Sequence, residues 1–176
     1  SIAQFPEMKE RTIVVNGASK SYAMTGWRVG YIGAAKEIAQ ACDKIQGQFT
    51  SATCSIGQKA MHAAADMDVA AIHPMRDAFK KRRDIVYNLL KEIPGLKTNY
   101  PDGAFYFFPD ISYYIGKAGI KNSTDLCMYL LNKAHVGLVA GDAFGNDNHI
   151  RISYAAAEDK LMEAMKRIKN ALVELK

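Results

Sequence analysis

A long helical stretch with a proline near each end most constrains how this chain can fold. Pro74 suits the first turn of a helix, and His73 before it is pushed toward extended backbone, so a boundary is expected at that junction. Pro94-Gly95 ends the helical pattern. The apolar positions that share one face of this helix are Phe79, Val86, Leu90 and Ile93. We therefore predict two domains, residues 1–73 and 74–176, with the long helix opening the second.

The first domain reads as part of an α/β sheet domain. Residues 12–15 are apolar and mostly β-branched and run into Asn16-Gly17, which predicts a buried strand ending at a turn. Residues 29–33 predict a second short strand, and residues 34–65 are largely helical with a break near residues 47–55. This order favours a mixed sheet-and-helix fold.

The second domain reads as a smaller α+β unit. Strands are predicted at residues 103–108, 136–139 and 149–153, and Ser123 or Thr124 can cap the helix between the first two. A last helix carries one apolar face, made by Leu161, Met165, Ile168, Leu172 and Leu175. The fold class predicted for the whole chain is α/β.

Charge and composition exclude several classes of protein. The net charge is +5, and the densest basic cluster, residues 80–83, falls inside the long helix, where a solvated helix face is favoured over a nucleic-acid patch. No apolar run is long enough to cross a membrane, and the first residues lack the pattern of a secretory signal. We therefore expect neither nucleic acid nor a membrane as a partner.

The three cysteines, Cys42, Cys54 and Cys127, are widely spaced and form no metal-ligand pattern with the histidines. We expect reduced thiols that pack as small buried hydrophobes, no metal site, and a cytoplasmic setting.

The segment around Lys20 carries the most chemical information. Lys20 lies among small residues just past the end of a predicted strand, and ligands of α/β sheets bind at such ends. A Schiff-base lysine needs a partly deprotonated amine, which a nearby cation favours, and Arg28 can supply that cation and also grip a phosphate with two nitrogens. From the residues alone, a surface lysine on a polar turn is the commoner outcome.

A resemblance changes that balance. The small residues before Lys20, followed by Tyr-Ala-Met-Thr-Gly-Trp-Arg-Val-Gly-Tyr at residues 22–31, resemble the lysine signature of class I aminotransferases, the aspartate aminotransferase family. The resemblance implies that the chain is the C-terminal part of a fold-type I enzyme that uses pyridoxal 5'-phosphate. By it, Lys20 holds the cofactor as a Schiff base and moves the substrate proton, Arg28 pairs with the cofactor phosphate, and Ser19 adds a hydrogen bond. In one departure, Gly17 stands where some members carry a phosphate-binding serine.

Arg151 is the second functional candidate. It alternates with Ile150 and Ile152, so its side chain should point away from the face that carries the two isoleucines. An arginine on an exposed edge strand is the alternative, but residues 148–155 resemble the family's strand that binds the substrate α-carboxylate. Residues 141–145 resemble a loop near the substrate, with Phe144 expected at the pocket edge, although an ordinary glycine-rich turn explains them nearly as well.

The resemblance implies transfer of an amino group between an amino acid, with aspartate favoured, and a 2-oxo acid such as 2-oxoglutarate, in a homodimer. The family's chains are roughly twice as long, and the preceding half supplies the acidic partner of the pyridine nitrogen, so we expect this chain alone to be inactive. The alternatives are a pyridoxal-phosphate-dependent lyase of the same fold, the effector domain of a transcription regulator, and a non-catalytic oligomerisation piece. A basic helix-turn-helix segment before Ser1 would favour the regulator.

Overall fold

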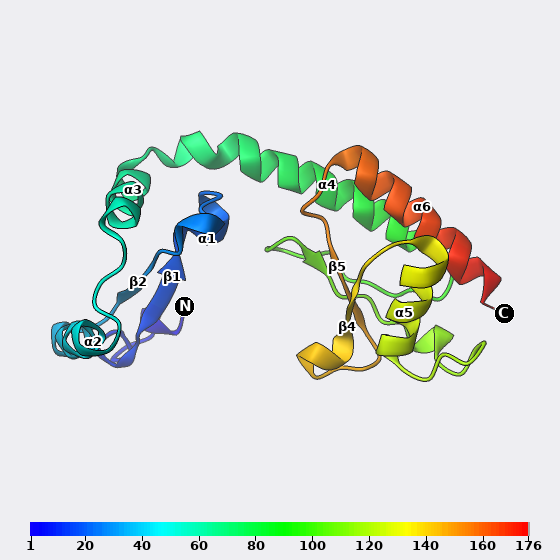
Figure 1. The fold of residues 1–176 in the computed structure, drawn as a ribbon, viewed down its shortest axis with the longest axis horizontal. Coiled ribbons are helices and arrows are strands. Elements are labelled where there is room, and N and C mark those ends of the chain that lie inside the picture. The colour runs from blue at the N-terminus through cyan, green and yellow to red at the C-terminus, as the bar shows by residue number, and fades with distance from the viewer. Residues whose placement is uncertain (176) are drawn as a thin grey trace. The chain divides into compact units, whose positions relative to one another are not determined.

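A computed structural model describes residues 1–175, and in it the chain divides into two units (Figure 1). The first unit is Ser1–His73, and the second begins at Pro74. This junction lies at the start of the long helix, whose first turn accommodates Pro74. The expectation of extended backbone at His73 was wrong, because His73 is helical, with φ of −58° and ψ of −41°. The two units are described in turn.

The first unit contains a two-stranded antiparallel sheet and two helices, of 14 and 12 residues. β1 (Val14–Gly17) pairs with β2 (Gly30–Gly33), and the four-residue α1 (Ala18–Ser21) follows β1 directly. α2 (Lys36–Phe49) and α3 (Ser55–Asp66) come next, so the predicted break in the helical stretch is confirmed. Short 3₁₀ turns complete the unit at Ile2–Gln4, Lys9–Arg11, Thr25–Trp27 and Val69–Ile72.

The prediction that the first strand is buried was wrong. Val14 is 42% exposed and Val15 is 76% exposed. β1 pairs only with β2 among residues 1–175, so the described chain supplies too little apolar surface to cover these two side chains. The buried hydrophobic residues of this unit are few: Ala18, Met24, Val29 and Ala64.

The second unit is built on three helices and a three-stranded sheet. The helices are α4 (His73–Lys91), α5 (Ser123–Ala134) and α6 (Glu158–Glu174). The predicted long helix is confirmed, with Val86 and Leu90 buried on its apolar face. The apolar face of the last helix is confirmed as well, since all five of its predicted members are buried: Leu161, Met165, Ile168, Leu172 and Leu175.

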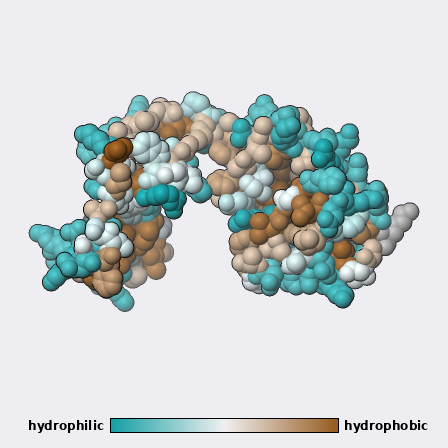
Figure 2. All heavy atoms as spheres, viewed as in Figure 1, coloured by the Kyte–Doolittle hydropathy of each residue, from teal (hydrophilic) through white to brown (hydrophobic). Residues whose placement is uncertain are grey.

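The sheet of the second unit has the order β3-β5-β4 and is antiparallel throughout. β5 (Ile150–Ser153) is central, flanked by β3 (Tyr106–Phe107) and β4 (Val139–Ala140). One face of the sheet adds its side chains to a single core of twenty buried residues that draws on all three helices. Figure 2 shows apolar residues, in brown, reaching the visible surface of both units.

Three details of the second unit differ from the sequence prediction. The strand expected over residues 136–139 is formed only at Val139–Ala140. The strand expected over residues 103–108 keeps only Tyr106–Phe107, because Ala104 has φ of +60°, which extended backbone does not allow. The cap of α5 is Asn122, whose side chain accepts a hydrogen bond from the Asp125 amide, rather than Ser123 or Thr124. Ser123 instead turns its hydroxyl toward Asp147.

The basic cluster of α4 is partly neutralised by its surroundings. Lys81 pairs with Glu158 at 2.7 Å, and Arg83 donates to the Pro101 carbonyl at 3.0 Å. No helix within residues 1–175 combines the length and the apolar character that crossing a membrane requires.

The cysteine prediction was right in one part and wrong in another. All three cysteines are free thiols, but only Cys127 is buried, whereas Cys42 and Cys54 are exposed. Both exposed thiols belong to the sparsely covered first unit.

Candidate active site

Lys20 is carried by α1, the single turn of helix that follows β1 without a connecting loop. The turn is fixed by Ala18, which is fully buried, while the Lys20 side chain is exposed. The sequence prediction that Lys20 lies just past the end of a strand is confirmed. The Lys20 side chain is therefore carried at the surface by a short, anchored element.

Two hydrogen bonds tie Lys20's neighbours together. The Thr25 hydroxyl donates to the Ser19 carbonyl at 2.9 Å, and an Arg28 guanidinium nitrogen donates to the Thr25 carbonyl at 2.9 Å. Residues 19, 25 and 28 thus form one connected turn around the lysine. Only one Arg28 nitrogen takes part in this contact, so its other N–H groups can still reach an anion.

The same turn contains two strained residues. Ala23 has φ of +54° and Arg28 has φ of +53°, both in the left-handed region that residues with a Cβ rarely adopt. Such positions persist only where the surrounding structure holds them, and they gather at functional sites. Two such residues within six positions give the turn of residues 23–28 an unusual backbone path.

Gly17 has a structural reason to lack a side chain. A Cβ at Gly17 would lie 3.3 Å from the Val29 carbonyl oxygen and 3.5 Å from the Gly30 Cα. The β1–β2 pair is close-packed at this point, so a larger residue three positions before Lys20 would press on backbone. The departure from the family pattern noted in the sequence therefore fits the local packing.

In the second unit, Arg151 lies on the central strand β5. Ile150 is fully buried and Ile152 is 4% exposed, while Arg151 is half-buried on the opposite face, so the predicted alternation is confirmed. The guanidinium carbon is 4.5 Å from the centroid of the Tyr106 ring and 4.6 Å from that of Phe144. The structure thus brings together Arg151 and Phe144, the two residues that the resemblance assigned to the substrate.

Phe144 is presented by a tightly held turn. It ends the 3₁₀ turn Gly141–Phe144, and its own side chain is 47% exposed. A Cβ at Gly141 would lie 2.2 Å from the Asn146 carbonyl oxygen, so only glycine fits there. The Asp142 amide in this turn donates to the hydroxyl of buried Ser123 at 3.4 Å, and the Ser123 amide and hydroxyl in turn donate to Asp147.

Tyr106 was not among the site residues predicted from the sequence. The neighbouring Phe107 is in the core, 1% exposed, but Tyr106 faces the other side of the sheet and lies against Arg151. Phe108 stacks on His149 and meets Phe144 edge-on, which extends this aromatic surround. The period of two along a strand would have separated Tyr106 and Phe108 from Phe107.

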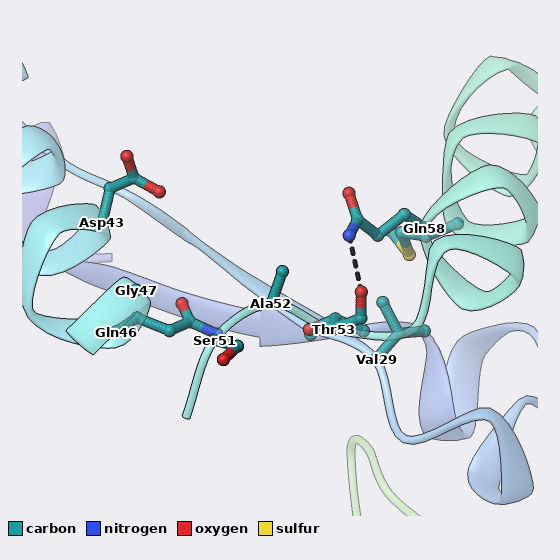
Figure 3. Close-up of a pocket in the computed structure, with 10 residues that line it drawn as sticks. Val29, Asp43, Gln46, Gly47, Ser51, Ala52, Thr53 and Gln58 are labelled. Atoms are coloured by element: carbon teal, nitrogen blue, oxygen red, sulfur yellow. Dashed lines mark hydrogen bonds between the residues drawn. The ribbon is translucent and has the colours of Figure 1, made fainter. Parts of the chain in front are cut away.

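The first unit contains a hollow of about 570 Å³, which Figure 3 shows with its lining residues. Val29 and Gly30 line it, next in sequence to Arg28, but Lys20, Ser19 and Arg28 do not. Its polar lining comes mainly from the end of α2 and residues 51–58, where Gln58 donates to the Thr53 carbonyl at 2.6 Å. Within residues 1–175 no cluster of three or more His, Cys, Asp or Glu could hold a metal ion.

Comparison with known proteins identifies the family to which this chain is similar. The model of the family described as aminotransferase class I and II matches residues 2–168. A bifunctional aspartate aminotransferase and glutamate/aspartate-prephenate aminotransferase of Petunia hybrida is 50% identical over 184 aligned residues. That alignment covers all of this chain and 38% of the Petunia protein.

Solved structures agree. The aspartate aminotransferase of Rhizobium meliloti matches with a TM-score of 0.95 at 43% identity, over all of this chain and 46% of that one. The aromatic aminotransferase of Pyrococcus horikoshii matches with a TM-score of 0.90 at 39% identity, over 99% of this chain and 46% of that one. The chain thus spans less than half the length of these relatives, and it belongs to the class I and II aminotransferases, within the aspartate aminotransferase family.

Proposed function

We propose that this chain is the part of an aspartate aminotransferase-type enzyme that carries the cofactor-bearing lysine, Lys20, and the substrate-carboxylate arginine, Arg151. The observation that carries the proposal is the connected turn of residues 19–28. It presents an amine, a hydroxyl and a guanidinium together, in a chain of a family that uses pyridoxal 5'-phosphate.

The residues of this turn fit that cofactor by their chemistry. The cofactor has an aldehyde, which a primary amine can hold, and a phosphate, which a guanidinium and a hydroxyl can hold. Lys20 supplies the amine, Arg28 keeps unused N–H donors, and Ser19 is half-buried beside them. The turn gives no carboxylate for the pyridine nitrogen, so the set is a partial one.

Each residue then has a distinct task. Bound pyridoxal phosphate supplies an electron sink for the bond-breaking at the amino acid's α-carbon. Lys20 holds the cofactor at its amine and moves the α-proton. Arg28 and Ser19 hold the phosphate. Arg151 binds the substrate α-carboxylate with two parallel N–H donors, and Phe144 forms the edge of the substrate pocket.

The relatives' greater length supports a further part of the proposal. We assign the first unit to the C-terminal part of the large cofactor-binding domain of a fold-type I enzyme, and the second unit to its small domain. The missing carboxylate and the rest of the phosphate site would come from a segment that precedes Ser1. The chain alone would then be inactive, and the complete enzyme would be a cytoplasmic homodimer acting on aspartate and 2-oxoglutarate.

A chimera tests this proposal. This chain replaces the matching region of the Rhizobium meliloti aspartate aminotransferase, with which it shares 45% identity over 168 residues. We expect transfer of the amino group from aspartate to 2-oxoglutarate. Lys20→Ala should lower kcat at least about a thousandfold, whereas Lys36→Ala, an exposed lysine of the same unit, should leave it unchanged.

Arg151→Lys in the same chimera should raise KM for aspartate about tenfold or more, because an ammonium cannot grip a carboxylate with two parallel bonds. A folded chimera whose activity survives Lys20→Ala would refute the assignment of Lys20. One in which Arg151→Lys leaves KM unchanged would refute the assignment of Arg151.

A further inference from the structure

The sheet of the second unit places Tyr106 beside Arg151 by its register. Tyr106 is the direct partner of Ser153 across the β3–β5 pair, and Ser153 lies two residues from Arg151 on the same strand. All three side chains therefore share one face of the sheet. Tyr106 and Arg151 are diagonal neighbours, a separation that an aromatic ring and a long side chain can bridge.

The guanidinium of Arg151 lies over two aromatic rings. The Tyr106 and Phe144 ring centroids lie 4.5 and 4.6 Å from its central carbon, within the range of a cation–π contact. Among residues 1–175, neither a carboxylate nor a carbonyl accepts a hydrogen bond from it. The N–H donors point outward from the edge of the guanidinium plane, so contacts with ring faces do not consume them.

The two rings differ in how firmly they are fixed. Tyr106 is half-buried and is locked by the strand pairing of β3 with β5. Phe144 is nearly half exposed and belongs to the turn Gly141–Phe144, in which the Asp142 amide donates to the Ser123 hydroxyl. Tyr106 is thus the more rigid of the two supports.

We propose that Tyr106 is a positioning residue, whose ring holds the Arg151 guanidinium in the orientation that presents its two parallel donors to a carboxylate. This inference rests on the proposed role of Arg151. An arginine side chain loses much rotamer freedom when it binds a ligand, and a side chain already ordered by stacking loses less. The tyrosine hydroxyl takes no part, so phenylalanine should replace Tyr106 without loss.

The order of the Arg151 side chain tests the proposal independently of catalysis. In the 176-residue chain, the ¹⁵N relaxation of the Arg151 Nε–H group should report a rigid side chain in the original protein and in Tyr106→Phe. In Tyr106→Leu, which keeps apolar volume but lacks the ring, it should report a mobile one. Phe144→Leu, on the exposed turn, is a second variant that does not disturb the sheet and should show a smaller loss of order.

Titration with maleate, a dicarboxylate probe, provides the second readout. We expect the Arg151 Nε–H signal to shift on binding, with Kd unchanged in Tyr106→Phe and raised about fivefold in Tyr106→Leu. Within the chimera, the matching result is a similar rise in KM for aspartate with kcat unchanged, since ordering a ground-state contact affects binding alone.

The outcomes separate the two claims. If maleate leaves the Arg151 signal unshifted in every variant and Arg151→Lys leaves KM for aspartate unchanged in the chimera, the carboxylate role of Arg151 fails. If maleate binds at Arg151 but Tyr106→Leu leaves both its order and its affinity unchanged, that role stands and the positioning role of Tyr106 is wrong. A mobile Arg151 in the original protein would also overturn the positioning role.

Discussion

In the second unit twenty apolar residues are buried in one core, whereas in the first unit only four are. Helices show the contrast well. Leu130 on α5 is fully buried, but on α2 Ile45 is 59% exposed and Phe49 is 84% exposed. A chain of some seventy residues needs most of its apolar side chains inside to offset the loss of conformational entropy.

The contrast separates two ways of holding a candidate functional residue. Arg151 sits on the central strand of a well-packed sheet, and its direction follows from the burial of Ile150 and Ile152. The turn that carries Lys20 is instead held by hydrogen bonds from the Thr25 and Arg28 side chains to backbone carbonyls, with little core beneath it. We infer that the second unit is self-sufficient, while the first depends on further chain to become stable.

The sharpest way to break this comparison is to separate the units. Residues 74–176 alone should unfold in one cooperative thermal transition, because they retain the whole core of the second unit. Residues 1–73 alone should show no such transition, since four buried side chains cannot stabilise a fold. Circular dichroism over a temperature ramp measures both. A cooperative transition in residues 1–73 would remove the distinction.

Thiol reactivity gives the next largest expected difference. Burial raises the pKa of Cys127 to about 11, so roughly one molecule in a thousand carries its thiolate at pH 8. Backbone hydrogen bonds from Gly57 and Ile56 lower the pKa of exposed Cys54. We expect Cys54 to react with iodoacetamide at least about a hundredfold faster than Cys127. Peptide mass mapping follows the modification of each cysteine over time. Comparable rates for Cys54 and Cys127 would mean that the core of the second unit opens readily.

The third prediction compares truncation of two apolar helical residues, one buried in the second unit and one exposed in the first. Leu130→Ala should lower the free energy of unfolding by about 3 kcal/mol, because it removes buried methyl groups and leaves a cavity. Ile45→Ala, on the exposed side of α2, should change it by less than about 0.5 kcal/mol. Urea denaturation of each variant checks the pair. If Ile45→Ala lowers the free energy of unfolding by clearly more than about 0.5 kcal/mol, the first unit has a substantial core of its own.

The smallest predicted effect concerns the turn that carries Phe144. Gly141→Ala would place a Cβ 2.2 Å from the Asn146 carbonyl oxygen, and we expect a loss of about 2 kcal/mol and a displaced Phe144. Gly137→Ala is the matched control, since a Cβ there meets nothing within 4 Å. Thermal melting compares the two. Equal stability would mean that the turn adapts without cost.

Much of the second unit could be predicted from its sequence because local signals and burial agree there. The apolar face of α6 and the alternation along β5 both survive in the structure, since each buries the side that the pattern marks. The strand over residues 103–108 was overestimated because a single left-handed residue, Ala104, interrupts it. The intrinsic backbone preferences of alanine do not predict a left-handed conformation at this position.

The first unit was harder to predict for a different reason. The apolar run before Lys20 reads as a buried strand because its composition is that of a covered sheet, yet the described chain leaves Val14 and Val15 exposed. The partnership of Tyr106 with Arg151 depends on register across two strands far apart in sequence, which composition does not encode. The Thr25 bridge between Ser19 and Arg28 likewise depends on the strained turn.

Trapping with borohydride tests the central claim most directly. Pyridoxal phosphate is added to the chimera and to the 176-residue chain alone, the imine is reduced, and the modified lysine is found by peptide mass mapping. We predict full modification at Lys20 in the chimera and weak, scattered modification in the chain alone. Modification of the chimera at any other lysine would contradict the assignment of Lys20. A stable, Lys20-specific product in the chain alone would contradict the claim that its site is incomplete.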